Sequence, residues 1–129
     1  MEVLTVPKKA SLHKVLVVDD QDMLREMLKD FLSGEGYKIT EASNGKECVE
    51  YTKKQEFDAI FMDVRMPEMD GLEALKELRA QGIKSPVFLM SGFGDVNSVE
   101  DAQKRGAQNF LPKPFTLDKA LEMLHGSES

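Results

Sequence analysis

Short apolar runs alternate with amphipathic segments along nearly the whole chain. The run Val15–Val18 is short and rich in β-branched residues, which is typical of a buried strand. The segment that follows carries apolar residues at helical spacing, and its predicted core stripe consists of Leu24, Met27, Leu28 and Phe31. The same two patterns recur four more times. They predict strands at 15–18, 37–40, 57–62, 86–90 and 107–111, and helices at 22–33, 44–54, 70–80, 95–105 and 116–124.

Five strand–helix units with short loops predict an α/β fold. Strands joined by helices pair in parallel, and helices then cover both faces of the sheet. Right-handed crossovers leave few topologies, of which the flavodoxin-like (βα)5 doubly wound sheet with strand order 2-1-3-4-5 is the common one at this size. We therefore expect one domain over residues 13–125, with a flexible N-terminal tail at 1–12 and a C-terminal tail at 126–129.

Composition narrows the class of protein. The 129 residues carry a net charge of −6 and no basic patch interleaved with aromatics, which argues against direct nucleic-acid binding. No apolar run approaches the length of a membrane span, and the N-terminal stretch lacks the apolar centre of a signal peptide. A single cysteine allows no internal disulfide. We therefore expect a cytoplasmic protein without a membrane partner.

Polar side chains follow four of the predicted strands where each strand ends. The first strand is followed by Asp19 and Asp20, the third by Asp63, the fourth by Ser91 and the fifth by Lys113. In the predicted strand order these strands are neighbours, so their carboxyl ends meet at one edge of the sheet, where ligands bind in such folds. Three carboxylates repel one another by roughly 4 kcal/mol for each close pair. One lysine offsets only part of this repulsion, and a hard divalent cation such as Mg²⁺ fits the rest.

Each of these residues also has an ordinary explanation on its own. Asp20 or Asp22 can cap the helix that follows, and Asp63 can cap a turn. An isolated Lys113 is an ordinary solvated charge, and an isolated Ser91 an ordinary loop hydroxyl. Their shared placement at strand ends on one edge favours a functional site.

Four motifs together resemble the receiver domain of bacterial two-component response regulators, in particular the single-domain, chemotaxis-regulator-like type. The motifs are VLVVDD (15–20), FMDVRMPEMDG (61–71), LMSG (89–92) and NFLPKPF (109–115). Any one of them is weak, whereas the set in this order is specific. The resemblance covers nearly the whole chain.

The resemblance implies a phosphoacceptor signalling domain. It makes Asp63 the acceptor of a phosphoryl group from a histidine kinase or a histidine phosphotransfer protein. It also implies that Asp19, Asp20, Asp63 and the backbone carbonyl of Arg65 hold Mg²⁺ or Mn²⁺. Such a domain is not an enzyme in the usual sense, because it catalyses only its own phosphorylation and the hydrolysis of its acyl phosphate.

The resemblance further assigns a switch. Lys113 would pair with the phosphoryl group, Ser91 would donate its hydroxyl to it, and Phe110 would turn inward when Ser91 moves. Pro114 matches a proline often preceded by a cis peptide bond. The switched surface would comprise segments 95–105, 107–111 and 116–124, and it would bind a downstream protein target.

Several residues are candidates for contact with partners: Met23, Val96, Val99 and Phe115. Met23 lies beside the acidic pair, and an exposed methionine adapts to partner surfaces, although packing at the edge of the core is the simpler explanation. Segment 95–105 has a thin apolar stripe, which suits either a moving part or an ordinary amphipathic helix. Arg65 is a candidate to lie over the phosphoryl group and slow its hydrolysis.

Three other classes are alternatives. A phosphotransferase of the haloacid dehalogenase type also uses an aspartyl nucleophile and Mg²⁺, but it places a second acid where this chain has Arg65. A flavodoxin-like electron carrier needs a phosphate-cradling loop after the first strand, where this chain has two acids. A protein-interaction module that is not phosphorylated shares the fold, and the complete set of acids, hydroxyl and lysine argues against it.

Overall fold

The computed structural model describes residues 14–92, 94–96 and 98–128. Five parallel strands form one sheet in the order β2-β1-β3-β4-β5, which confirms the predicted topology. The strands are β1 (Lys14–Val18), β2 (Lys38–Ala42), β3 (Ala59–Asp63), β4 (Val87–Ser91) and β5 (Asn109–Pro112). The helices are α2 (Asp22–Gly34), α3 (Gly45–Lys54), α4 (Gly71–Ala80), α5 (Val99–Lys104) and α6 (Leu117–Glu128). The expected tail at 1–12 lies outside the described residues.

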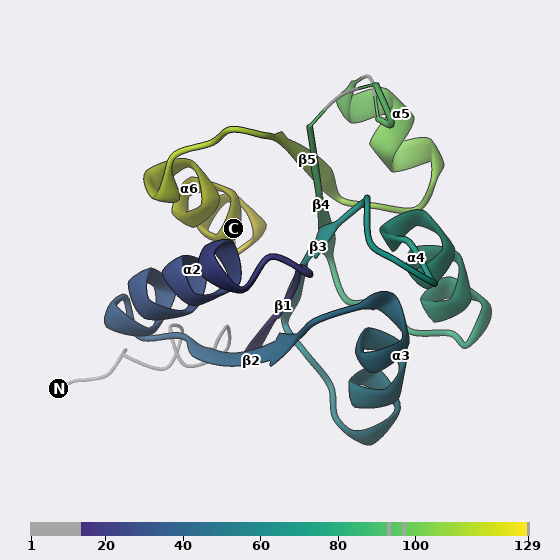
Figure 1. Cartoon of the computed structure of the whole chain (residues 1–129), viewed down its shortest axis with the longest axis horizontal. Coiled ribbons are helices and arrows are strands. Elements are labelled where there is room, and N and C mark those ends of the chain that lie inside the picture. The colour runs from purple at the N-terminus through teal and green to yellow at the C-terminus, as the bar shows by residue number, and fades with distance from the viewer. Residues whose placement is uncertain (1–13, 93, 97, 129) are drawn as a thin grey trace, which may run out of the picture.

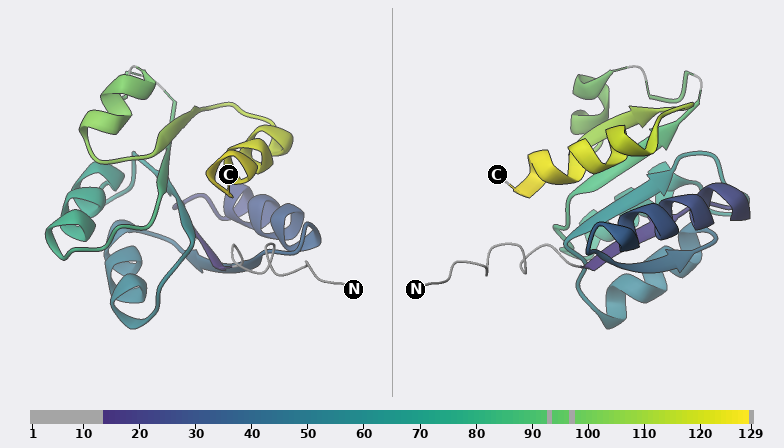
Figure 2. Two further views of the ribbon diagram at one scale, coloured as in Figure 1. Left: turned by 180° about the vertical axis from the view of Figure 1, so that it is seen from behind. Right: turned by 90° about the vertical axis from the view of Figure 1, so that its left-hand side faces the viewer.

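Helices cover both faces of the sheet. Figure 1 shows α2 and α6 on one face and α3, α4 and α5 on the other, and Figure 2 shows the same two layers from two further sides. Alternate residues of each central strand belong to the two cores: Leu16 and Ile60 pack under α3 and α4, whereas Val17 and Phe61 pack under α2 and α6. Because both faces are buried, β1 and β3 read as continuous apolar runs instead of alternating ones.

Helix ends follow local capping chemistry. The side chain of Asn44 accepts a hydrogen bond from the Glu47 amide at the start of α3. Asp70 and Glu73 form a reciprocal capping box at the start of α4. These caps fix where α3 and α4 begin, and the predicted starts lie within one residue of them.

Several predicted boundaries differ from the structure. The second strand starts after Tyr37, because the Tyr37 amide donates to the Leu32 carbonyl in the turn that ends α2. The fifth strand starts after Ala107, whose amide closes the turn after α5 by donating to Ala102. α6 continues through residues 126–128, which were expected to be a tail.

The fourth predicted helix is much shorter than expected. α5 begins only after Ser98, whose hydroxyl oxygen accepts from the Asp101 amide as an N-cap. Val96 therefore precedes the helix, and its side chain is buried in the core at 4% exposure. Helical spacing alone does not show that Val96 lies in a loop.

The predicted core stripe of α2 contains one error. Leu28 and Leu32 are buried, and Leu24 and Phe31 pack against the same core, but Met27 is 47% exposed. Each helix residue is turned about 100° from the next, so Met27 lies at the edge of a stripe centred on Leu28.

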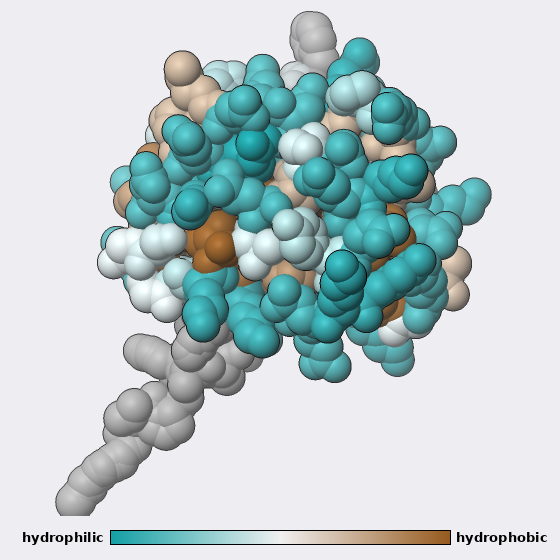
Figure 3. All heavy atoms as spheres, turned by 60° about the horizontal axis from the view of Figure 1, so that its bottom comes forward, coloured by the Kyte–Doolittle hydropathy of each residue, from teal (hydrophilic) through white to brown (hydrophobic). Residues whose placement is uncertain are grey.

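One face of the molecule is mostly hydrophilic. The face shown in Figure 3 is covered largely by polar and charged side chains, with small apolar areas between them. Within the described part of the chain, every helix is too short or too polar to cross a membrane.

Candidate functional site

The carboxyl ends of β1, β3 and the segment after β5 bring their charged side chains together. Carboxylate oxygens of Asp19, Asp20 and Asp63 all lie within 4.8 Å of one another. The Lys113 Nζ atom lies 3.0 Å from Asp63 Oδ1 and 3.2 Å from Asp19 Oδ2. Three acids and one cation therefore converge at the edge of the sheet where the sequence places them.

The backbone around Asp63 is fixed from both sides. Asp63 is the last residue of β3, and the amide of Val64 still donates to the Met90 carbonyl in β4 at 2.9 Å. The amide of Gly71 closes the following loop by donating to the Val64 carbonyl at 2.8 Å. A Cβ atom at Gly71 would collide with the carbonyl oxygen of Asp63, so only glycine allows this close approach.

Burial changes the ionisation of Asp63. Its side chain is nearly enclosed, and this burial, together with the charges of Asp19 and Asp20, raises the pKa of the Asp63 carboxyl to about 6, even though the nearby Lys113 lowers it. Burial also lowers the pKa of Lys113, but its hydrogen bonds and charge interactions with Asp63 and Asp19 outweigh that effect and raise it overall. At neutral pH the site therefore holds an ionised Asp63 beside a protonated Lys113.

Ser91 lies at the carboxyl end of β4, the strand next to the one that ends in Asp63. It is the last residue of β4, one position beyond the register partner of Asp63, and it is buried. Its Oγ atom has no hydrogen-bond partner among the described residues. A buried hydroxyl without a partner is costly, so its presence favours a ligand that binds here.

Phe110 lies in β5, and Lys113 and Pro114 follow directly after that strand. Phe110 is half-buried and packs against the core under α3 and α4. The Lys113 amide donates to the Ser91 carbonyl at 2.8 Å, which fixes the segment that carries the lysine. The Lys113–Pro114 peptide bond is cis, the geometry that the resemblance implies.

The candidate partner residues occupy different surroundings. Met23 is 75% exposed on α2, and Val99 is exposed on α5, so both are accessible to a partner. Phe115 is half-buried against the core under α2 and α6. Val96 is buried, which contradicts the expectation that it offers a contact surface in this conformation.

The Arg65 side chain pairs with Asp95, an acid that the sequence did not indicate as its partner. Its Nε atom lies 2.7 Å from Asp95 Oδ2, and its Nη2 atom lies 3.0 Å from Asp95 Oδ1. These two hydrogen bonds raise the pKa of the Arg65 guanidinium. The side chain is 74% exposed, so little packing opposes a change of partner.

An open pocket of about 510 Å³ lies over the charge cluster. Its lining residues are Asp20, Gln21, Asp63, Arg65, Gly92 and Lys113. The pocket therefore gives a small ligand direct access to Asp63.

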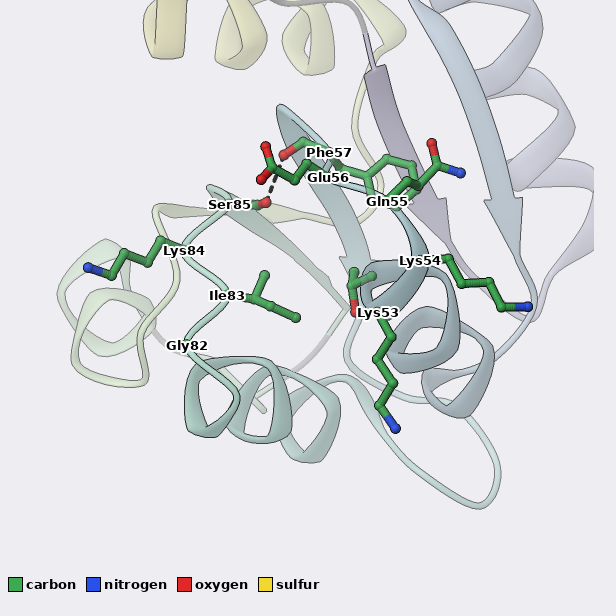
Figure 4. Close-up of a pocket in the computed structure, with 10 residues that line it drawn as sticks. Lys53, Lys54, Gln55, Glu56, Phe57, Gly82, Ile83, Lys84 and Ser85 are labelled. Carbon is green, nitrogen blue, oxygen red and sulfur yellow. Dashed lines mark hydrogen bonds between the residues drawn. The ribbon is translucent and has the colours of Figure 1, made fainter.

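A second hollow, of about 570 Å³, lies between the C-terminal ends of α3 and α4 and is drawn in Figure 4. Ser85 donates to the Phe57 carbonyl there at 2.7 Å. The side chains of Lys53, Lys54 and Lys84 extend outward in three directions instead of converging. This hollow therefore lacks the gathered polar groups of the first pocket.

Sequence reasoning missed two arginines that the fold uses. Arg25 donates to the backbone carbonyl of Asp19 at 2.6 Å and pairs with Asp22 and Glu41. Among the described residues, Arg79 donates only to backbone carbonyls, those of Ile83, Ser85 and Gly106. Only the Asp22–Arg25 spacing of three residues is visible in the sequence.

Comparison with known proteins agrees with this geometry. The response regulator receiver domain model matches residues 15–125. The chemotaxis protein CheY of Bacillus subtilis (strain 168) is 40% identical over 114 residues, which cover 88% of this chain and 95% of that protein. The receiver domain of the Francisella response regulator 1452 superposes with a TM-score of 0.84 at 31% identity, covering 90% of this chain and 96% of that one.

A second solved structure carries ligands. CheY in the CheX-CheY-BeF3-Mg²⁺ complex from Borrelia burgdorferi superposes with a TM-score of 0.81 at 29% identity, covering 88% of this chain and 87% of that one.

Proposed function

The chain belongs to the response regulator receiver domain family of two-component systems, and we propose that it transmits a signal by accepting a phosphoryl group on Asp63. Domains of this family are signalling domains and not enzymes that act on separate substrates. The observation that carries the proposal is the buried Asp63 carboxylate, which lies 3.0 Å from the Lys113 ammonium and faces an open pocket.

The chemistry uses Asp63 as a nucleophile. A carboxylate oxygen of Asp63 attacks the phosphorus of a phosphohistidine on a histidine kinase or a histidine phosphotransfer protein. The new O–P bond forms as the P–N bond breaks, and the electron pair of that bond goes to the imidazole nitrogen of the donor. The Lys113 ammonium lies where it offsets the negative charge of the incoming group. Water later hydrolyses the acyl phosphate and resets the domain.

The acidic cluster fits a divalent cation, Mg²⁺ or Mn²⁺. Three carboxylates face a single ammonium group, and at ~4 Å each pair of acids repels by roughly 4 kcal/mol. Asp19, Asp20 and Asp63, with the backbone carbonyl of Arg65, would hold the ion, and hard oxygen ligands of this kind suit Mg²⁺. When bound, the cation offsets the negative charge on the transferring phosphoryl group. The Mg²⁺ in the Borrelia burgdorferi CheY complex supports this assignment.

The phosphoryl group also gives Ser91 the partner that its hydroxyl lacks. Phosphorylation adds roughly −1.5 to −2 charge and three acceptor oxygens. Ser91 then donates its hydroxyl to the new anion, and the half-buried Phe110 follows into the space that Ser91 leaves. The affected surface comprises α5, β5 and α6, where the exposed Val99 is a contact for a downstream protein target.

We further propose that the domain works in the cytoplasm through protein partners, without direct contact with nucleic acid or membrane. Met23, exposed on α2 beside the acidic cluster, is a contact for the phosphoryl donor. The CheY complex with CheX from Borrelia burgdorferi supports the view that a domain of this shape acts by binding another protein.

Intact-mass measurement after incubation with Mg²⁺ and a small phosphodonor tests the proposal. We expect one added phosphoryl group, which is absent in Asp63→Asn and absent when the metal is chelated. The folded state of the Asp63→Asn variant is checked by circular dichroism. A folded wild-type protein that gains no phosphoryl group from any donor would support the interaction-module alternative instead.

A further inference from the structure

We propose that Arg25 is a positioning residue that holds the Asp19–Asp20 segment in the geometry needed for cation binding. This inference rests on the proposed function, because it concerns the same acidic cluster. Arg25 lies on α2, outside the cluster, and touches it only through the backbone of Asp19.

The guanidinium of Arg25 joins three parts of the fold. Its Nη1 atom donates to the Asp19 carbonyl at 2.6 Å, its Nη2 atom to Asp22 Oδ1 at 2.6 Å, and its Nε atom to Glu41 Oε1 at 3.1 Å. Only 14% of the Arg25 side chain is exposed, and its bonds to the Asp19 carbonyl and to Glu41 are partly buried, whereas its bond to Asp22 lies at the surface. The end of β1, the first turn of α2 and strand β2 are therefore fixed to one rigid planar group.

The carbonyl that Arg25 binds determines the direction of Asp20. It belongs to the planar peptide unit between Asp19 and Asp20, so fixing this oxygen fixes the plane from which Asp20 continues. The other groups of Asp19 are fixed as well: its amide donates to Ala42, and its carboxylate accepts from the Gln21 amide. Asp20 itself is exposed and faces the pocket, so its place depends on this backbone.

The N-cap residue of α2 does not hold the turn before the helix through its side chain, so Arg25 has this role. Gln21, the N-cap residue of α2, makes no side-chain capping hydrogen bond. The turn from β1 into α2 is held instead by the Asp19 carboxylate and by the Arg25 guanidinium. A lysine at position 25 keeps the charge but has no planar fork, so it cannot bind the three acceptors in this arrangement.

Positioning and simple charge effects predict opposite results. Removing a positive charge near three acids strengthens cation binding by electrostatics alone. Loss of positioning weakens cation binding, because the oxygens no longer converge. Residues that orient the ligands of a metal without touching it contribute about 10-fold or more to affinity, which is large enough to reverse the charge effect.

Arg79 provides a matched control. Its guanidinium is also partly buried and donates to three backbone carbonyls, those of Ile83, Ser85 and Gly106, none of which belongs to the acidic cluster. Arg25→Lys and Arg79→Lys therefore remove a similar clamp from two different places. A structural role alone predicts that both variants lose stability and that neither changes cation affinity.

The test compares the unphosphorylated wild type with Arg25→Lys and Arg79→Lys. Each protein is titrated with Mg²⁺, and binding is monitored by the NMR shifts of the backbone amides. The stability of each protein is measured by urea unfolding. We expect Arg25→Lys to bind Mg²⁺ about 10-fold more weakly and Arg79→Lys to bind as the wild type does. Without metal, we expect faster hydrogen exchange at the amides of Asp19 and Gln21 in Arg25→Lys only.

Arg25→Gln extends the test. We expect it to bind Mg²⁺ more weakly than wild type despite its lost positive charge, and tighter binding would overturn the proposal. Equal Mg²⁺ affinity of Arg25→Lys and wild type would overturn it too. Wild-type protein that binds no Mg²⁺ and accepts no phosphoryl group would instead refute the proposed function, so the two failures are distinct.

Discussion

The ammonium nitrogen of Lys113 lies 3.0 Å from the Oδ1 atom of Asp63, across the strand that separates β3 from β5. The same nitrogen lies 3.2 Å from Asp19, so one cation is shared between two buried carboxylates. Burial of the Asp63 carboxyl and the charge of Asp19 outweigh the effect of this lysine, so the pKa of Asp63 remains raised. One ammonium group does not balance the negative charge of the acids, so the site can bind a further cation or a charged ligand.

The raised pKa of Asp63 makes stability depend on pH. Because the folded pKa is about 6 and the unfolded one about 3.9, the folded state binds the proton more tightly. The resulting stabilisation is fully present below about pH 4 and is lost as the pH rises through about 6. We expect Asp63 to lower the free energy of unfolding by at most about 3 kcal/mol across this window in metal-free buffer.

Urea unfolding of wild type and Asp63→Asn at about pH 4 and about pH 7.5 measures this dependence. The variant has no titrating group at position 63, so its stability relative to wild type should rise with pH. A stability difference between the two proteins that stays constant over this range would contradict the raised pKa.

Replacement of Lys113 should slow phosphorylation. Lys113→Met removes the cation that faces the transferring group, and we expect the rate with a small phosphodonor to fall about 100-fold. The rate is measured by intact mass over time. Lys119→Met removes an exposed lysine that pairs with Glu122 on α6, and it should react as the wild type does. Similar rates for the two variants would exclude this role for Lys113.

The Arg65–Asp95 ion pair should affect the lifetime of the acyl phosphate. Asp95 holds the guanidinium through two hydrogen bonds, and a phosphoryl anion on Asp63 competes for it. If Arg65 then shields the phosphorus from water, Arg65→Ala shortens the lifetime several-fold and Asp95→Asn lengthens it. In the Arg65→Ala background, Asp95→Asn should have no effect.

Release of inorganic phosphate from the phosphorylated protein measures these lifetimes. Arg105→Ala, which breaks the exposed ion pair with Asp101 on α5, is the control and should leave the lifetime unchanged. An Arg65→Ala variant that loses phosphate at the wild-type rate would refute shielding by Arg65.

Gly71 should tolerate no side chain. A Cβ atom there collides with the carbonyl oxygen of Asp63, so Gly71→Ala must displace the backbone that carries the acceptor. We expect a loss of about 2 kcal/mol or more in the free energy of unfolding, measured in urea. Gly34→Ala is the control: nothing lies within 4 Å of its added Cβ at the end of α2, and it should stabilise slightly. Equal stability of both variants would contradict the collision.

Ser91→Ala should raise the stability of the unphosphorylated protein and weaken the switch. The Ser91 hydroxyl is buried without a hydrogen-bond partner among the described residues, so its removal should stabilise the unphosphorylated protein by about 1 kcal/mol. The same change removes the donor for the phosphoryl group. NMR shifts of Phe110 on phosphorylation should therefore be smaller than in the wild type. A variant that is destabilised and still shifts Phe110 fully would contradict both expectations.

The strand order and the placement of the acids at strand ends could be predicted from the sequence. Buried strands such as β1 and β3 are continuous apolar runs, and this pattern marks a parallel sheet covered on both faces. Once the order was predicted, the convergence of Asp19, Asp63 and Lys113 at one edge followed from the direction of the chain. The periodicity of apolar residues and the direction of each strand follow from short sequence segments, so they can be predicted without a structure.

Features that depend on contacts between segments distant in the chain could not be predicted from the sequence. Helical spacing places Val96 on a helix face, but the N-cap at Ser98 leaves it in a loop whose path carries it into the core. Glu41, Asp95 and Gly106 bind Arg25, Arg65 and Arg79 from positions at least 16 residues away in the chain, so the spacing of these arginines does not reveal those partners.

The sequence by itself thus determined the fold class and the edge of the sheet at which Asp19, Asp20, Asp63 and Lys113 meet, because the alternation of apolar segments and the ends of strands are encoded locally. The tertiary structure alone decided that Lys113 is shared between two acids, that the Ser91 hydroxyl has no partner among the described residues and that the Asp19 carbonyl is bound by Arg25. These are distances between atoms far apart in the chain, and they are set only when the sheet and its helices pack together.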